Sequence, residues 1–289
     1  MKKFDLVIKG LNGKDIAADC CFNEDKSSQS VLVFVHGFKG FKDWGHFNLM
    51  TKRFVELGFA VIKFNFSHNG GTVSNPVDFP DLESFGKNDF IKELNDLSAV
   101  MDAVVVGEGA LKNQFLFDKF RSCINLNDIS IVAHSRGGGV SLIYANEDPR
   151  ITKVVTWAAV SDFFARLPDE KSLGLWKKNK VLYIENGRTK QQMPMYVNFL
   201  EVMEKFKERL NIEQACRNLS IPVLVVQGGD DQVVPEEEGR NLAKWIPQSS
   251  SLLIPTADHV FGSSHPCIGE ELPGETAEVI NATAAFLMQ

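Results

Sequence analysis

One serine in this sequence occupies a position typical of a catalytic nucleophile. Ser135 follows the apolar run 129–133, which predicts a strand, and precedes three glycines and a helical stretch over 140–146. This strand–turn–helix setting is that of the G-x-S-x-G nucleophile elbow, although Ala133 stands where that pattern has its first glycine. Small residues at Ala133 and Gly137 suit the sharp turn, because large side chains there would collide. The segment alone is also compatible with a serine that only caps a helix.

A serine hydroxyl becomes a good nucleophile only when a base removes its proton, and the chain offers a base and an acid further on. His259 follows the last predicted strand, and a histidine can accept and return a proton near neutral pH. Asp231 lies in a polar turn after the apolar run 223–226, where open α/β sheets place their functional side chains. Asp230 and Asp162 are alternative acids, and a turn or helix-capping role competes for Asp230.

Attack on a carbonyl also requires donors for the negative charge that develops on its oxygen. The backbone N–H of Arg136, directly after the serine, is one candidate, at the positive N-terminus of the next helix. The backbone N–H of Phe38 is the other, in the glycine-containing loop after the apolar run 31–35. A plain glycine turn is the competing interpretation of that loop. We expect His36 to shape the loop and His134 to point away from the nucleophile, so neither is the expected base. His46, His68 and His265 are assigned no chemistry.

Composition limits the class of protein. The 289 residues are 44% hydrophobic and 24% charged, which is typical of a soluble globular protein, and we expect one domain over 1–289. A net charge of −6 without a basic stripe argues against a nucleic-acid partner. No run approaches the roughly 20 apolar residues that cross a bilayer, and the N-terminus predicts a strand and not a signal peptide. The five scattered cysteines fit no zinc or disulfide pattern and favour a cytoplasmic location.

Predicted strands and helices alternate along most of the chain, which indicates an α/β protein with a mostly parallel sheet and helices on both faces. After an N-terminal hairpin over 4–22, the expected strands are 31–35, 59–66, 129–133, 151–158, 221–226 and 251–254. The main expected helices are 47–57, 88–106 and 276–287, with a loop over 67–86. Segment 161–218 interrupts the alternation. It is expected to hold an amphipathic helix, whose apolar stripe consists of Tyr196, Phe199, Leu200, Met203, Phe206 and Leu210. It either packs on the domain or forms a small cap over a pocket, and we expect the cap.

These features together resemble the α/β-hydrolase family. The resemblance covers roughly 31–289 and rests on four motifs in that family's order: the His36-Gly37 pair, the Ser135 elbow, the Asp231 turn and the Asp258-His259 turn. Within the family, the chain looks most like the dienelactone-hydrolase-like and cinnamoyl (feruloyl) esterase branch. The resemblance implies an eight-stranded, mostly parallel sheet with a small helical cap, a Ser135–His259–Asp231 triad and no cofactor. It further implies a serine hydrolase that cleaves small-molecule carboxylic esters through an acyl-enzyme.

The residues leave other functions open. An aminopeptidase or an acyltransferase on the same scaffold would use the same three side chains. A catalytically silent binding protein would commonly lack one of them. The run Gly137-Gly138-Gly139 does not have the G-x-G-x-x-G spacing of a dinucleotide site.

Overall fold

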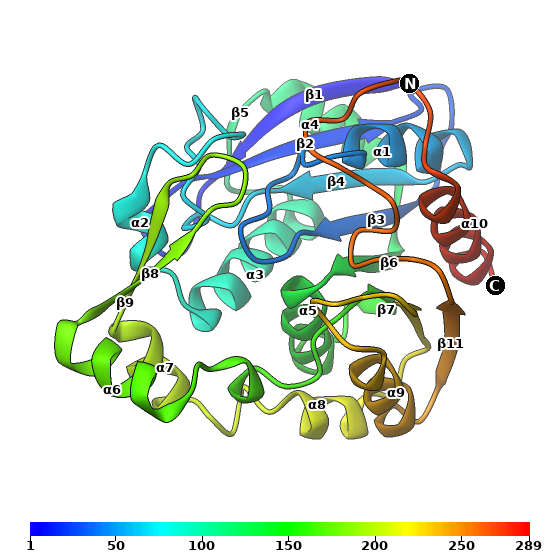
Figure 1. The fold of residues 1–289 in the computed structure, drawn as a ribbon. Coiled ribbons are helices and arrows are strands. Elements are labelled where there is room, and N and C mark those ends of the chain that lie inside the picture. The colour runs from blue at the N-terminus through cyan, green and yellow to red at the C-terminus, as the bar shows by residue number, and fades with distance from the viewer.

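The computed structural model describes residues 1–289 and is built around one large sheet (Figure 1). Its strands are β1 (Lys2–Ile8), β2 (Ile16–Phe22), β3 (Gln29–Val35), β4 (Ala60–Phe64), β5 (Ala110–Lys112), β6 (Ile124–His134), β7 (Ile151–Trp157), β10 (Val223–Gly228) and β11 (Ser249–Ile254). They are ordered β11-β10-β7-β6-β3-β4-β2-β1-β5. The strands from β11 to β4 are parallel, and β2, β1 and β5 extend the sheet in antiparallel fashion.

The predicted fold class is confirmed, but the sheet has nine strands and not eight. The additional strand is the short β5, which pairs with β1 at the sheet edge. Its three residues are half-buried or exposed, so no run of buried apolar residues marks it in the sequence.

Helices cover both faces of the sheet, as expected for apolar strands that are buried on both sides. One face carries α1 (Phe47–Glu56) and α10 (Gly274–Leu287). The other face carries α3 (Phe90–Val106), α4 (Gln114–Ser122), α5 (Arg136–Glu147), α8 (Ile212–Asn218) and α9 (Glu236–Trp245). Alternate residues of β3 serve the two cores: Val31, Val33 and Val35 face one, and Leu32 and Phe34 face the other.

Segment 161–218, the expected small helical cap, contains a β-hairpin as well as helices. A short 3-10 turn (Phe164–Arg166) and α6 (Glu170–Asn179) precede the antiparallel strands β8 (Val181–Glu185) and β9 (Gln192–Tyr196), and α7 (Asn198–Lys205) follows. The amphipathic stripe is therefore split, because Tyr196 belongs to a strand. Tyr196 donates a hydrogen bond to Glu83 of α2 (Leu82–Gly86), a helix within the predicted loop. Figure 1 shows the hairpin, α6 and α7 at the left, near α2 and away from α10.

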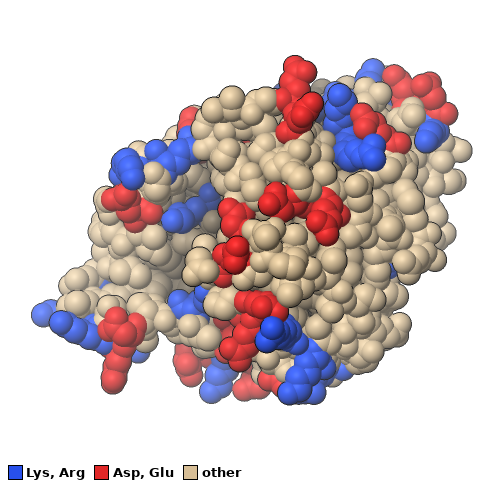
Figure 2. Space-filling view, turned by 45° about the vertical axis from the view of Figure 1, so that its right-hand side comes forward, with Lys and Arg blue, Asp and Glu red and all other residues tan.

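The surface carries charges of both signs. On the face drawn in Figure 2, Lys and Arg side chains lie mostly beside Asp and Glu and form no continuous basic area. This distribution agrees with the net charge of −6. A phosphate backbone would need an extended basic face, which this view does not offer.

Candidate active site

Ser135 forms the sharp turn between β6 and α5. Its φ of 57° lies in the left-handed region that non-glycine residues rarely adopt. Space around the turn is tight: a side chain at Gly137 would overlap the backbone of His36, and one at Gly138 would overlap Ala159. Such backbone strain persists only where surrounding structure holds it, and it is typical of functional residues.

The three side chains predicted for proton transfer lie in one hydrogen-bonded chain. The Oγ atom of Ser135 is 3.0 Å from Nε2 of His259, and Nδ1 of His259 is 2.8 Å from Oδ2 of Asp231. Ser135 follows β6, and the loops after β10 and β11 carry Asp231 and His259. These strands are parallel members of one sheet, so their carboxyl ends meet at one edge although the residues are far apart in sequence.

Asp231 is held as a buried carboxylate. Its Oδ1 accepts hydrogen bonds from the backbone N–H groups of Val233 and Val234, both at 2.8 Å. Burial alone raises the pKa of Asp231, but the hydrogen bond with His259 and those two amides outweigh burial and lower the pKa below its ordinary value. The carboxylate is therefore ionised near neutral pH and can orient the imidazole.

The alternative acids lie outside this chain of hydrogen bonds. The side chain of Asp230 makes no hydrogen bond to the protein, and its backbone N–H donates to the oxygen of Ala257. Asp162 accepts from the backbone N–H groups of Phe164 and Ala165 at the start of the 3-10 turn. Asp230 therefore has a turn position and Asp162 a capping role, and neither carboxylate is hydrogen-bonded to His259.

The loop that follows β3 approaches Ser135 as closely as glycine allows. A Cβ atom on Gly37 would lie only 2.8 Å from Cβ of Ser135. The loop turns back immediately, with Gly40 N–H bonded to Gly37 oxygen at 3.0 Å, and the backbone N–H of Phe38 donates to no backbone or side-chain acceptor. Arg136 is the first residue of α5, so its N–H has no acceptor within the helix. Both predicted donors are free to bind an oxygen beside Ser135.

His36 and His134 have different roles. His36 shapes the loop as expected: Nδ1 donates to Gly37 oxygen at 2.8 Å and Nε2 accepts from Phe66 N–H at 3.2 Å. Burial lowers the pKa of His36 to about 4, which keeps it neutral. His134, to which the sequence assigned no chemistry, has its Nε2 2.8 Å from the main-chain oxygen of His259. No sequence pattern links these two residues, because the contact exists only once β6 and the loop after β11 are side by side.

The Arg136 side chain also contributes to the site, beyond its backbone N–H. Its Nε lies 3.1 Å from Oε2 of Glu93, its Nη2 lies 2.8 Å from Oε1, and both side chains are buried. The guanidinium sits 4.2 Å from the ring centroid of Phe90, within cation–π range. Burial raises the pKa of Glu93, although Arg136 and Asn88 oppose that shift. The charge of Arg136 within the elbow was the only sequence signal for this pair.

Two spaces open onto Ser135. The first is a cavity of about 230 Å³ with a mostly apolar lining that includes Phe38, Phe90 and Phe163. The second is an open groove of about 450 Å³, which is lined by His259 as well as Ser135. His259 does not line the apolar cavity, so the two sides of the serine differ in chemistry.

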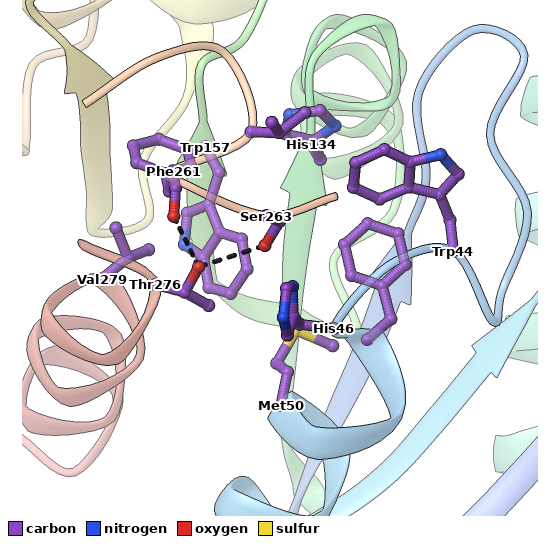
Figure 3. A pocket seen from close by; sticks show the side chains of 11 residues that line it. Trp44, His46, Met50, His134, Trp157, Phe261, Ser263, Thr276 and Val279 are labelled. Carbon is purple, nitrogen blue, oxygen red and sulfur yellow. Dashed lines mark hydrogen bonds between the residues drawn. The ribbon is translucent and has the colours of Figure 1, made fainter. Parts of the chain in front are cut away.

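A third cavity, lined in part by the residues that follow His259, is too small for a substrate. Figure 3 shows Trp44, His46, His134 and Trp157 around it, with Thr276 donating to Phe261 oxygen at 2.6 Å. Its volume of about 20 Å³ is that of a single water molecule. His46 Nδ1, a buried nitrogen with no protein partner, belongs to a residue that lines this cavity.

Comparisons with known proteins agree with this architecture. A family model described as the alpha/beta hydrolase fold matches residues 174–266. Est1E from Butyrivibrio proteoclasticus with bound ferulic acid is similar over 98% of this chain and 97% of its own, with a TM-score of 0.71 and 18% identity. The chain has the α/β-hydrolase fold. The resemblance identified from the sequence is therefore confirmed at the level of the fold.

Two further structures are similar to this α/β-hydrolase-fold protein. The esterase domain of a Rhodothermus marinus protein has a TM-score of 0.63 and 19% identity, covering 99% of this chain and 98% of its own. A putative dienelactone hydrolase from Klebsiella pneumoniae subsp. pneumoniae MGH 78578 has a TM-score of 0.60 and 14% identity, covering 100% and 98%. No curated protein sequence is a significant match.

Three further properties of this α/β-hydrolase-fold protein concern metal ions, membranes and cysteines. Its side chains form no group of three or more His, Cys, Asp or Glu that could hold a metal ion. None of its helices combines the length and the apolar character needed to cross a membrane. All five cysteines are free thiols, and four of them are buried.

Proposed function

We propose that this protein is a serine hydrolase that cleaves carboxylic esters through an acyl-enzyme. The observation that carries the proposal is the continuous hydrogen-bonded chain from Ser135 Oγ through His259 to Asp231, with distances of 3.0 and 2.8 Å. Two free backbone N–H groups beside the serine, of Phe38 and Arg136, add the donors that such a reaction requires.

In the proposed reaction, Ser135 Oγ attacks the ester carbonyl carbon while Nε2 of His259 accepts the hydroxyl proton. Phe38 and Arg136 N–H groups stabilise the oxyanion that forms. When the bond to the alcohol oxygen breaks, His259 gives its proton to that oxygen and the acyl group stays on Ser135. A water molecule, deprotonated by His259, then attacks the acyl-enzyme, and the proton returns to Ser135 as the acid leaves. Asp231 keeps the imidazole in the tautomer that has its free lone pair on Nε2.

Segment 161–218 acts in this proposal as a cap inserted into the single domain 1–289. Its apolar side chains complete the cavity beside the serine: Leu167, Pro168, Trp176, Leu182, Ile184, Met195 and Phe199. A mostly apolar cavity of this kind suits an aliphatic or aromatic acyl group. A small-molecule ester is therefore the proposed substrate, and the free cysteines suit a reducing, cytoplasmic location.

A fluorophosphonate probe, which reacts with activated serines, tests the proposal. We expect covalent labelling at Ser135 in the wild type and none in Ser135→Ala, with turnover of p-nitrophenyl butyrate lost in parallel. Absence of labelling in a folded wild-type protein would contradict the proposal. Aminopeptidase and acyltransferase activity remain the second candidates because the same side chains serve them. Amino-acyl anilides, and esters offered with an acceptor alcohol, would reveal these activities.

A further inference from the structure

The open groove beside Ser135 is rich in hydrogen-bond donors and contains no carboxylate. None of its lining residues is Asp or Glu, whereas Lys39, Trp44, Asn186 and Arg188 all line it. The indole N–H of Trp44 donates to no protein group. The amide oxygen of Asn186 accepts from the backbone of Arg188, but its NH₂ group donates to no protein atom. A wall of this kind favours a ligand that accepts hydrogen bonds.

Lys39 is a cation without a carboxylate partner. Its Nζ donates to the main-chain oxygen of Glu185 at 3.3 Å and forms no salt bridge, although the side chain is only partly exposed. Burial lowers the pKa of Lys39 from its ordinary value, as expected for an ammonium that is desolvated and unpaired. Its φ of 55° is strained for a non-glycine residue, so the loop holds this side chain at some energetic cost.

Arg188 supplies a second positive charge to the groove. Both terminal nitrogens of its guanidinium lie 3.2 Å from Oδ1 of Asp78, which is an exposed residue outside the groove lining. The guanidinium Nε has no protein acceptor. Glu185, the other nearby acid, is paired with Lys190 at 3.2 Å. The groove therefore has positive charge that the surrounding carboxylates balance only in part.

The reaction geometry assigns the groove to the alcohol part of the ester, provided that the proposed function holds. His259 must return its proton to the leaving oxygen, so the leaving group has to lie within reach of the imidazole. His259 lines the groove and does not line the apolar cavity. The acyl part then occupies the apolar cavity, and the alcohol part occupies the donor-rich groove.

We propose that the alcohol part of the natural substrate carries an anionic group, a carboxylate or a phosphate, that binds Lys39 with support from Arg188. This inference rests on the proposed ester hydrolysis and adds the charge class of the leaving group. An anion at this position would supply the partner that Lys39 lacks. Hydrogen bonds to charged groups are worth enough to raise specificity by about tenfold or more, even in a groove that is partly open to solvent.

Three butyrate esters with matched alcohols test the inference: those of glycolamide, glycolate and 2-hydroxyethyl phosphate. The measured quantity is the ratio of kcat/KM for each anionic ester to that for the neutral glycolamide ester. We expect a ratio of about ten for at least one anionic ester at low salt, falling as the salt concentration rises. A preference for the glycolate ester would identify a carboxylate, and a preference for the phosphate ester would identify a phosphate.

Variants connect the ratio to Lys39. Lys39→Met should bring the ratio close to one, and Lys39→Arg should retain most of it. The ratio compares two esters on the same variant. An effect of the substitution on the Phe38 N–H group, which would change kcat/KM for every ester alike, therefore cancels. Lys52→Met is the matched control, since Lys52 is an exposed cation on α1 that lies outside the groove lining and forms no salt bridge, and it should leave the ratio unchanged.

The failure of this inference is distinguishable from the failure of the proposed function. Hydrolysis of all three esters with equal kcat/KM would overturn the anionic leaving group and leave the serine hydrolase intact. The same holds if Lys39→Met keeps the preference. Absence of turnover for every ester, together with no fluorophosphonate labelling of Ser135, would overturn both.

Discussion

The Nε2 atom of His134 lies 2.8 Å from the main-chain oxygen of His259, so the residue before the proposed nucleophile holds the loop of the proposed base. A carbonyl oxygen only accepts hydrogen bonds, so Nε2 of His134 carries the hydrogen. The two imidazole rings are 4.8 Å apart between centroids. Burial, followed by the proximity of His259, lowers the pKa of His134 to about 3, so His134 stays neutral. We interpret His134 as a positioning residue for His259.

Replacement of His134 should therefore reduce turnover without abolishing binding. In His134→Leu the loop loses one buried hydrogen bond, and we expect kcat for p-nitrophenyl butyrate to fall about tenfold with little change in KM. His134→Gln offers an amide N–H in place of Nε2–H, so part of kcat should return. Steady-state kinetics on both variants measures the effect. Equal losses of kcat in the two variants would show that the hydrogen bond is not the cause.

The neutral state of His134 also predicts a pH dependence of stability. Its pKa is about 3 in the folded state and about 6.5 when unfolded, so the unfolded chain binds more protons between these values. The free energy of unfolding should then rise with pH across this window. The stabilising contribution of neutral His134 is present above about pH 6.5 and is lost as the pH falls below that value. For this one group the loss between pH 6.5 and pH 5 is about 1.6 kcal/mol.

Urea unfolding of the wild type and His134→Gln at pH 7, 6 and 5 measures this contribution. The variant lacks the titrating imidazole, so its stability should decline less steeply toward pH 5. His36 has a similarly lowered pKa of about 4 and is present in both proteins, so it cancels in the comparison. Parallel curves for the two proteins would refute the assignment of the pH dependence to His134.

Asp231 and Asp230 form a matched pair for testing the proposed acid. Asp231→Asn removes the charge that orients His259, and its NH₂ group can force the imidazole into the wrong tautomer. We expect kcat to fall by about four orders of magnitude, by analogy with the same change in other triads. Asp230→Asn should leave kcat near the wild-type value, because that side chain makes no hydrogen bond to the protein. A large loss in Asp230→Asn with little effect of Asp231→Asn would reverse the assignment.

Two neighbouring residues of β8 allow a test of whether the apolar cavity binds the acyl group. Ile184 lines the cavity, whereas the neighbouring Tyr183 is 58% exposed and does not. Ile184→Trp should fill part of the cavity and lower kcat/KM for p-nitrophenyl octanoate by tenfold or more relative to the acetate. Tyr183→Trp is the control and should leave that ratio unchanged. An unchanged ratio in Ile184→Trp would place the acyl group elsewhere.

Parts of the fold were not predictable from local sequence because packing overrides local preference. We expected the helix after Ser135 to begin at 140, since glycine disfavours helix, yet α5 begins at Arg136. Glycine is required at 137 and 138 because the backbone of His36 and the side chain of Ala159 leave no room for a side chain. The β8–β9 hairpin was missed because its two strands are short and partly exposed.

The amino-acid sequence by itself determined eight of the nine strands of the large sheet and the three residues that follow β6, β10 and β11. Parallel strands end at one edge of a sheet, so Ser135, Asp231 and His259 had to lie near one another once the α/β class was recognised. Only the tertiary structure decided what surrounds them. Three features join segments that no local pattern connects. They are the Arg136–Glu93 pair, the contact of His134 with the His259 loop, and the linings of the two unlike spaces beside the serine. Their geometry depends on how helices and the inserted hairpin pack, and that packing is a property of the whole chain.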